Sequence, residues 1–158
     1  MAFDGITIAS LVCELQEEIL DGRINKIAQP EADELLLTIK TNHGQKRLYI
    51  SANASLPLIY LTESNKPSPM TAPNFCMLLR KHLLSATIEE ISLVWFDRIV
   101  KIVLSTSSEF SDPRKKILYV ELMGRYSNII LTEDGKILGG NRGINCFDAG
   151  IRPLTVGR

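Results

Sequence analysis

The sequence is short of the features that mark several protein classes. Its 158 residues hold two histidines and three widely separated cysteines, Cys13, Cys76 and Cys146, with no CxxC pair. This pattern gives neither a disulfide framework nor a zinc signature, so we expect no metal and no cofactor. No apolar run approaches the about 18 residues of a membrane helix, and the N-terminus lacks the basic start of a signal peptide. We therefore expect a cytoplasmic protein with reduced thiols and no membrane contact.

The chain also lacks a net charge. Basic and acidic side chains number 18 each, and the sequence pI is about 6.7. A domain that grips nucleic acid through bulk charge is usually strongly basic, so any such role must come from local clustering. Apolar residues make up 45% of the chain and charged residues 23%. This composition is typical of one globular domain that buries its core without disulfides.

Hydrophobic periodicity predicts an α+β fold. Apolar residues at helical spacing indicate helices over residues 7–20 and 73–84. Short β-type segments follow each helix, and the turns at 42–44 (NHG) and 133–135 (EDG) are typical of hairpins. Strands are predicted at residues 24–29, 34–40, 46–50, 58–61, 88–94, 98–104, 116–122, 127–131 and 136–138. We expect a mostly antiparallel β-sandwich flanked by the two main helices.

Two segments stand apart from this pattern. Residues 62–73 are rich in Ser, Thr, Asn and Pro and are typical of a linker. The segment from residue 139 to residue 158 is rich in glycine and shows no periodicity, which favours loop structure. We predict a domain over residues 1–140 and an irregular tail over residues 141–158, at the edge of a longer chain.

Signatures of catalysis are missing as well. Neither GxSxG, a P-loop nor a GxGxxG after a strand occurs. Cys13 and Cys76 lie on predicted helices and His82 on an apolar helix face, so we expect all three in the core. The adjacent acidic pairs at 17–18 and 89–90 point to different sides and are expected to be solvated surface. We therefore expect no catalytic residue and no enzyme activity.

Two motifs carry side chains suited to RNA. Asp97 and Arg98 directly follow the single Trp and a Phe. An arginine fork can hold phosphate or stack on a base while the aspartate orients it; a structural turn with a local ion pair explains the pattern equally well. Residues 121–128 (ELMGRYSN) interrupt a strand with hydrogen-bonding side chains that suit RNA or phosphate contact. The alternative there is a β-bulge that redirects the chain.

Basic residues also form local clusters, at 46–47, 80–81 and 114–116. A surface that binds phosphates needs several such side chains on one side of the domain. The sequence does not show that geometry, and a solvated face is the alternative.

Taken in order, these motifs resemble the N-terminal domain of the NFACT family. The matching segments are 1–5 (MAFDG), 21–27 (DGRINKI), 29–30 (QP), 74–83 (NFCMLLRKHL), 97–98 (DR) and 121–128 (ELMGRYSN). The resemblance extends from residue 1 to about residue 140. Bacterial members of this family, first called fibronectin-binding protein A and now RqcH, are ribosome-associated quality-control factors.

The resemblance implies a function in handling RNA. Family members bind tRNA and the large ribosomal subunit obstructed by a nascent chain, and they promote C-terminal alanine tailing of stalled chains. The resemblance implies a tRNA-binding role for Asp97 and Arg98. It leaves Arg80, Lys81 and Arg125 as weaker candidates for RNA contact.

The resemblance also implies a fold similar to the N-terminal domain of formamidopyrimidine-DNA glycosylases. Those enzymes use an N-terminal proline amine followed by a catalytic glutamate, and Ala2 and Phe3 occupy the two positions here. A glycosylase activity is therefore disfavoured. The remaining alternative is a surface adhesin domain that binds fibronectin, against which the missing signal peptide and the unpaired cysteines argue.

Overall fold

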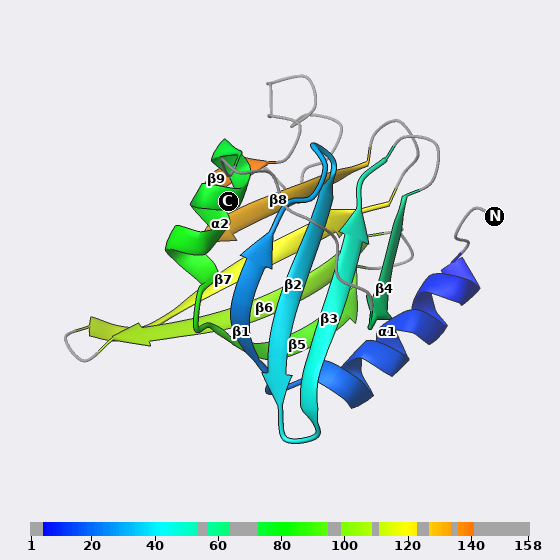
Figure 1. The fold of residues 1–158 in the computed structure, drawn as a ribbon, viewed down its shortest axis with the longest axis horizontal. Coiled ribbons are helices and arrows are strands. Elements are labelled where there is room, and N and C mark those ends of the chain that lie inside the picture. The colour runs from blue at the N-terminus through cyan, green and yellow to red at the C-terminus, as the bar shows by residue number, and fades with distance from the viewer. Residues whose placement is uncertain are drawn as a thin grey trace.

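The computed structural model describes residues 5–53, 57–63, 73–94, 99–108, 111–122, 127–133 and 136–140. Two helices and nine strands lie in this part of the chain (Figure 1). Helix α1 spans Gly5–Ile19 and helix α2 spans Asn74–Leu83. The strands are β1 (Arg23–Ala28), β2 (Glu34–Thr41), β3 (Gly44–Ser51), β4 (Leu58–Thr62), β5 (Thr87–Leu93), β6 (Ile99–Ser108), β7 (Ser111–Glu121), β8 (Asn128–Glu133) and β9 (Lys136–Gly140). The predicted α+β class is confirmed.

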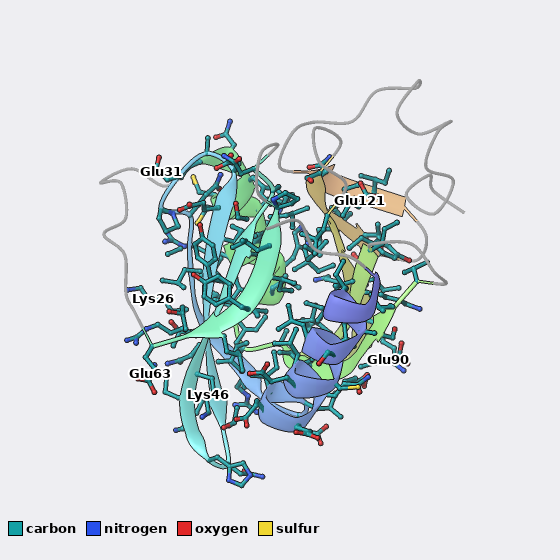
Figure 2. The ribbon with its side chains drawn as sticks, turned by 90° about the vertical axis from the view of Figure 1, so that its right-hand side faces the viewer. Lys26, Glu31, Lys46, Glu63, Glu90 and Glu121 are labelled. Atoms are coloured by element: carbon teal, nitrogen blue, oxygen red, sulfur yellow. The ribbon has the colours of Figure 1, made fainter. Side chains whose placement is uncertain are left out.

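The nine strands form one antiparallel sheet in the order β4-β3-β2-β1-β5-β6-β7-β8-β9. In its middle β1 and β5 share a single register pair, Arg23 and Thr87, which backbone hydrogen bonds from Ile88 to Gly22 and from Ile24 to Ala86 flank at 2.9 Å each. The sheet bends there, and the first half-sheet (β1–β4) lies over the second half-sheet (β5–β9), as the two views show (Figures 1 and 2). The expected sandwich is thus a single bent sheet with two facing halves.

The core fills the space between the two half-sheets. Because side chains alternate along a strand, Leu35, Leu37 and Ile39 of β2 point inward and are almost fully buried. Ile102 and Leu104 of β6 meet them from the second half-sheet within the same cluster. An apolar interior of this kind is the main source of stability in a small domain.

The helices close two open sides of the sandwich. Helix α1 packs on β5, β2 and β4, and α2 packs on β1, β6 and β9 (Figure 1). The predicted apolar face of α1 is confirmed, since Ile8, Leu15 and Ile19 are fully buried. Neither described helix is long and apolar enough to cross a membrane.

A tight turn joins α1 to β1. Asp21 takes the left-handed conformation with a φ of 67°, and the Gly22 amide donates to the Ile19 carbonyl at 3.0 Å. A Cβ at Gly22 would lie 2.6 Å from Cγ2 of Ile39. The close approach of β2 therefore requires a glycine at position 22.

Some expectations about local structure were wrong. Cys13 is exposed on α1 and His82 is only partly buried, so neither is a core residue, although Cys76 is buried as expected. Gly139 and Gly140 belong to β9, where pairing with β8 holds a segment that sequence alone assigned to a loop. Residues 141–158 and most of the expected linker lie outside the described residues. The likeness to glycosylases stays a prediction.

Candidate RNA interface

The motif formed by Asp97 and Arg98 lies outside the described residues, but the strands on both sides of it are described. β5 ends at Leu93, β6 begins at Ile99, and the Val94 amide donates to the Ile99 carbonyl at 3.0 Å. Residues 95–98 therefore connect two adjacent antiparallel strands.

Arg125 also lies outside the described residues, in the connection 123–126 between β7 and β8. The register of the strands brings the two connections to one end of the sheet. Ile99 of β6 pairs with Glu121 of β7, and Glu121 pairs with Asn128 of β8. The segments that hold Asp97, Arg98 and Arg125 thus leave the second half-sheet from neighbouring strand ends.

This end of the sheet contains buried polar side chains. Glu121 and Ser127 are fully buried and Asn128 is nearly so. The Asn128 side-chain oxygen accepts the Ile129 amide at 2.9 Å. Glu121 lies within the second half-sheet in Figure 2. Buried polar groups are usually held by hydrogen bonds, but the Ser127 hydroxyl has no hydrogen-bond partner in the part of the chain that the structure describes. Polar groups and fully buried apolar residues such as Leu122 and Ile129 therefore lie together where both connections begin.

Arg80 fastens α2 to the first half-sheet. Its Nε donates to the Ile27 carbonyl of β1 at 2.9 Å, and the Cys76 thiol approaches the same oxygen at 3.7 Å. Burial raises the pKa of the Cys76 thiol, with the Arg80 charge acting in the opposite direction. The Nε donor of the Arg80 guanidinium is thus used in a hydrogen bond within the domain.

The last turn of α2 is basic and lies away from the end where residues 95–98 connect. Lys81 is exposed, whereas Lys116 of β7 donates to the His82 carbonyl at 3.3 Å. Burial lowers the pKa of His82, assisted by the charges of Lys116 and Lys81. Lys116 precedes Glu121 by five residues on one strand, a span of about 17 Å. The structure therefore does not bring Arg80 and Lys81 next to the two connections.

Most other clustered cations pair with nearby carboxylates. Lys115 lies 3.7 Å from Glu89, and Arg114 lies 3.5 Å from Glu133. These ion pairs sit at the surface, where each is worth little to stability. They nevertheless compensate the charge, so this part of the sequence offers few free cations. The acidic pair at 89–90 is on the surface, as expected.

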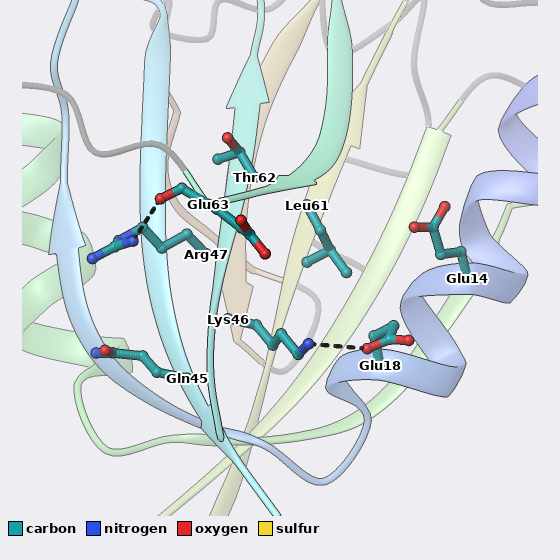
Figure 3. A pocket seen from close by; sticks show the side chains of 8 residues that line it. All are labelled: Glu14, Glu18, Gln45, Lys46, Arg47, Leu61, Thr62 and Glu63. Atoms are coloured by element: carbon teal, nitrogen blue, oxygen red, sulfur yellow. Dashed lines mark hydrogen bonds and ion pairs between the residues drawn. The ribbon is translucent and has the colours of Figure 1, made fainter. Parts of the chain in front are cut away.

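A depression of about 470 Å³ lies between α1 and the edge formed by β3 and β4 (Figure 3). Lys46 reaches across it to Glu18 at 3.4 Å, while Arg47 turns away and donates to the Glu63 carbonyl at 2.9 Å. Glu14 adds a second carboxylate from α1. The depression is thus lined by charges of both signs. No group of three or more metal-ligating side chains occurs among the described residues.

Two exposed lysines were not predicted to be part of a basic cluster, because neither has a basic residue directly beside it in the sequence. Lys26 of β1 and Lys40 of β2 are exposed and point away from the core. Lys40 pairs directly with Arg23 across the strands. They could have been found from the alternation of side chains along a strand, because both positions point outward on two adjacent predicted strands.

Comparison with known proteins identifies the family. The protein-family model that describes NFACT N-terminal and middle domains matches residues 4–158 of this chain. The chain belongs to the NFACT family. The resemblance stated from the sequence motifs is therefore confirmed.

The curated relatives of this NFACT chain include Rqc2 homologs named RqcH. It is 39% identical over 133 residues to the Rqc2 homolog RqcH of Bacillus subtilis and 41% identical over 133 residues to that of Streptococcus pneumoniae. Both alignments cover 84% of this chain, but 23% and 24% of the relatives. The chain thus spans about a quarter of the length of these curated relatives.

A solved structure shows the same fold. The N-terminal domain of the fibronectin-binding protein PavA from Streptococcus pneumoniae superposes with a TM-score of 0.87 and 39% identity. The match covers 91% of this chain and 55% of that one. The bent sheet and its two helices are therefore the architecture of this family's N-terminal domain.

Proposed function

We propose that this chain is the tRNA- and large-ribosomal-subunit-binding module of a ribosome-associated quality-control factor. As part of a longer protein, it would act on cytoplasmic ribosomes during the C-terminal alanine tailing of stalled nascent chains. The proposal assigns no catalytic residue to the domain. The observation that carries it is the 39% identity to an Rqc2 homolog over 84% of this chain.

The arrangement of the second half-sheet supports the assignment of the tRNA site to Asp97 and Arg98. The ends of β6, β7 and β8 that flank residues 95–98 and 123–126 are adjacent in register. Residue types suited to phosphate and base contact thus come from two connections that start side by side. Arg125 is the natural second contact in this arrangement.

Binding of tRNA by the purified chain across a salt series tests the proposal. The Asp97→Ala/Arg98→Ala variant removes one charge of each sign, so the net charge stays at zero. We expect affinity to fall as salt rises and to drop at least tenfold in this variant. Far-ultraviolet circular dichroism and urea unfolding would show that the fold is intact.

The matched control is Glu89→Ala/Lys115→Ala, which also removes one charge of each sign. This pair is exposed and 3.7 Å apart, and its loss should leave the fold unchanged. We expect its tRNA affinity to stay within twofold of the parent chain. An equal loss in both variants, or no tRNA binding by the parent, would contradict the assignment of the site.

Fibronectin binding is the second candidate, because the similar solved domain comes from a fibronectin-binding protein. The test is binding of the purified chain to immobilised fibronectin at physiological salt. Saturable binding that the Asp97→Ala/Arg98→Ala substitutions leave unchanged would favour an adhesin. We expect no saturable binding.

A further inference from the structure

The outer face of the first half-sheet is unusual in its composition. We define this outer face as the side chains of β1–β4 that point away from the core. They are set by the strand register as Arg23, Lys26 and Ala28 of β1; Glu34, Leu36, Thr38 and Lys40 of β2; Gln45, Arg47, Tyr49 and Ser51 of β3; and Leu58, Tyr60 and Thr62 of β4. Figure 2 shows Lys26 on this side of the layer. Neither helix packs over this face (Figure 1), but its middle is buried, because Ala28, Leu36 and Tyr49 form a small apolar cluster with Leu58.

The outer face carries four cations and one carboxylate. Arg23, Lys26 and Lys40 are exposed, and none forms an ion pair with another residue that the structure describes. Arg23 and Lys40 are direct cross-strand partners. Like charges in this position destabilise a sheet, and a bound anion would remove that cost. The face therefore favours a polyanionic partner.

The carboxylates near this face do not balance the cations. Glu34 lies at the opposite end of β2 from Lys40 and accepts a hydrogen bond from the Tyr49 hydroxyl. In Figure 3 the Glu63 carboxylate points toward Leu61, whereas the guanidinium of Arg47 lies on the other side. Positive charge thus accumulates locally on a chain whose net charge is zero.

An aromatic pair lies beside the cations. The rings of Tyr49 and Tyr60 are 5.2 Å apart and inclined at 48°. Tyr49 is buried, and its hydroxyl is held by Glu34, whereas Tyr60 is 40% exposed. Tyr60 stands two residues from Thr62, which pairs with Arg47, so the Tyr60 and Arg47 positions lie in adjacent rows spaced about 7 Å along the strands. Tyr49 therefore supports an exposed ring one row from a cation.

We propose that the outer face of β1–β4 binds an unpaired RNA segment, with phosphates on Arg23, Lys26 and Lys40 and a base stacked on Tyr60. Unpaired bases stack on exposed aromatic side chains, whereas a duplex hides the faces of its bases. This surface lies on the half-sheet opposite to residues 95–98, so it is a second RNA contact. It rests on the proposed function only for the choice of RNA as the polyanion.

Binding of a single-stranded RNA of about 12 nucleotides to the 158-residue chain, followed by fluorescence anisotropy, tests the proposal. Lys26→Ala/Lys40→Ala should weaken binding about tenfold and reduce the salt slope by about 1.4, or 0.7 for each lost cation. Lys101→Ala/Lys115→Ala removes the same charge from the second half-sheet and should change the affinity less than twofold. An equal loss in both double variants would overturn the proposal.

The aromatic contact has its own variant. Tyr60→Leu keeps an apolar side chain on β4 but removes the ring, and it should weaken binding about fivefold without changing the salt slope. A duplex RNA of equal length should bind less tightly and show no effect of Tyr60→Leu. Failure of the parent chain to bind the single strand, or equal affinity for the duplex, would refute the proposal.

The same variants separate this proposal from the proposed function. If Asp97→Ala/Arg98→Ala leaves tRNA affinity unchanged while Lys26→Ala/Lys40→Ala weakens single-strand binding, the proposed tRNA site is wrong and the outer face stands. The reverse result would leave the tRNA site in place and remove the outer face.

Discussion

Arg80 offers a test of whether a basic residue singled out for RNA contact works mainly inside the fold. The perturbation is Arg80→Ala, which removes the bond from Nε to the Ile27 carbonyl. A hydrogen bond from a charged group contributes about 1.5–3 kcal/mol when well buried. Arg80 is half-buried, so we expect the free energy of unfolding to fall by about 1–2 kcal/mol. For a chain of this size the melting temperature should fall by about 2–8 °C.

The neighbouring Lys81→Ala is the matched control. It removes the same charge from the same helix, and both substitutions have a similar small effect on helix propensity. Lys81 is exposed, so its loss should change the free energy of unfolding by less than about 0.5 kcal/mol. Urea unfolding followed by circular dichroism measures both values.

The tRNA affinity of the two variants, measured well below their melting temperatures, completes the test. We expect the Arg80→Ala variant to bind tRNA as the Lys81→Ala variant does, within twofold, because its guanidinium acts on β1. Equal stability of the two variants, together with weaker tRNA binding by Arg80→Ala alone, would refute this reasoning. Arg80 would then be an RNA contact whose bond to Ile27 contributes nothing.

Three further predictions concern pH and packing. Burial, with a hydrogen bond to Glu34, raises the pKa of Tyr49 above 10.0. The protonated Tyr49 hydroxyl therefore contributes its full stabilisation below pH 10.0, and this is lost as the pH rises above that value. The urea midpoint should thus decrease less at alkaline pH in the Tyr49→Phe variant than in the parent chain. Burial and nearby lysines lower the pKa of His82 below 6.5. The free energy of unfolding should therefore decrease as the pH drops through 6.5, and this decrease should be smaller in the His82→Gln variant. A Cβ at Gly139 would lie 2.4 Å from Cδ2 of Leu78, so Gly139→Ala should cost about 1–2 kcal/mol; in a Leu78→Ala background, a cost just as large would argue against this contact.

The elements of this fold could be predicted because their periodicity is local. The inward positions of α1 and of the strands follow from spacings of 3.6 and 2 residues, and burial confirms them. Gly139 and Gly140 were misassigned because their strand exists only through pairing with Ile130 and Leu131 of β8. Tertiary pairing overrides a low β-propensity, which no local pattern reveals.

The site could be predicted only in part, for a related reason. Asp97 and Arg98 stand out as a motif, but the partner of Arg80 is a carbonyl 53 residues away. Lys26 and Lys40 look isolated along the chain and come together only through the pairing of β1 with β2. Clusters that look basic in sequence can therefore be neutralised in space, and single cations can form a surface.

This distinction reconciles zero net charge with the proposed role in binding RNA. Arg114 and Lys115 of β7 lie in ion pairs with Glu133 and Glu89, whereas Arg23, Lys26 and Lys40 have no such partner among the described residues. Three phosphate contacts to a single strand give a salt slope of about −2, which corresponds to weak binding. The chain spans about a quarter of its relatives. Under the proposed function, tight attachment to an obstructed ribosome would therefore need further contacts from a longer protein, joined by effective concentration. Lengthening the chain should then raise affinity steeply, while the loss caused by Lys26→Ala/Lys40→Ala stays the same factor.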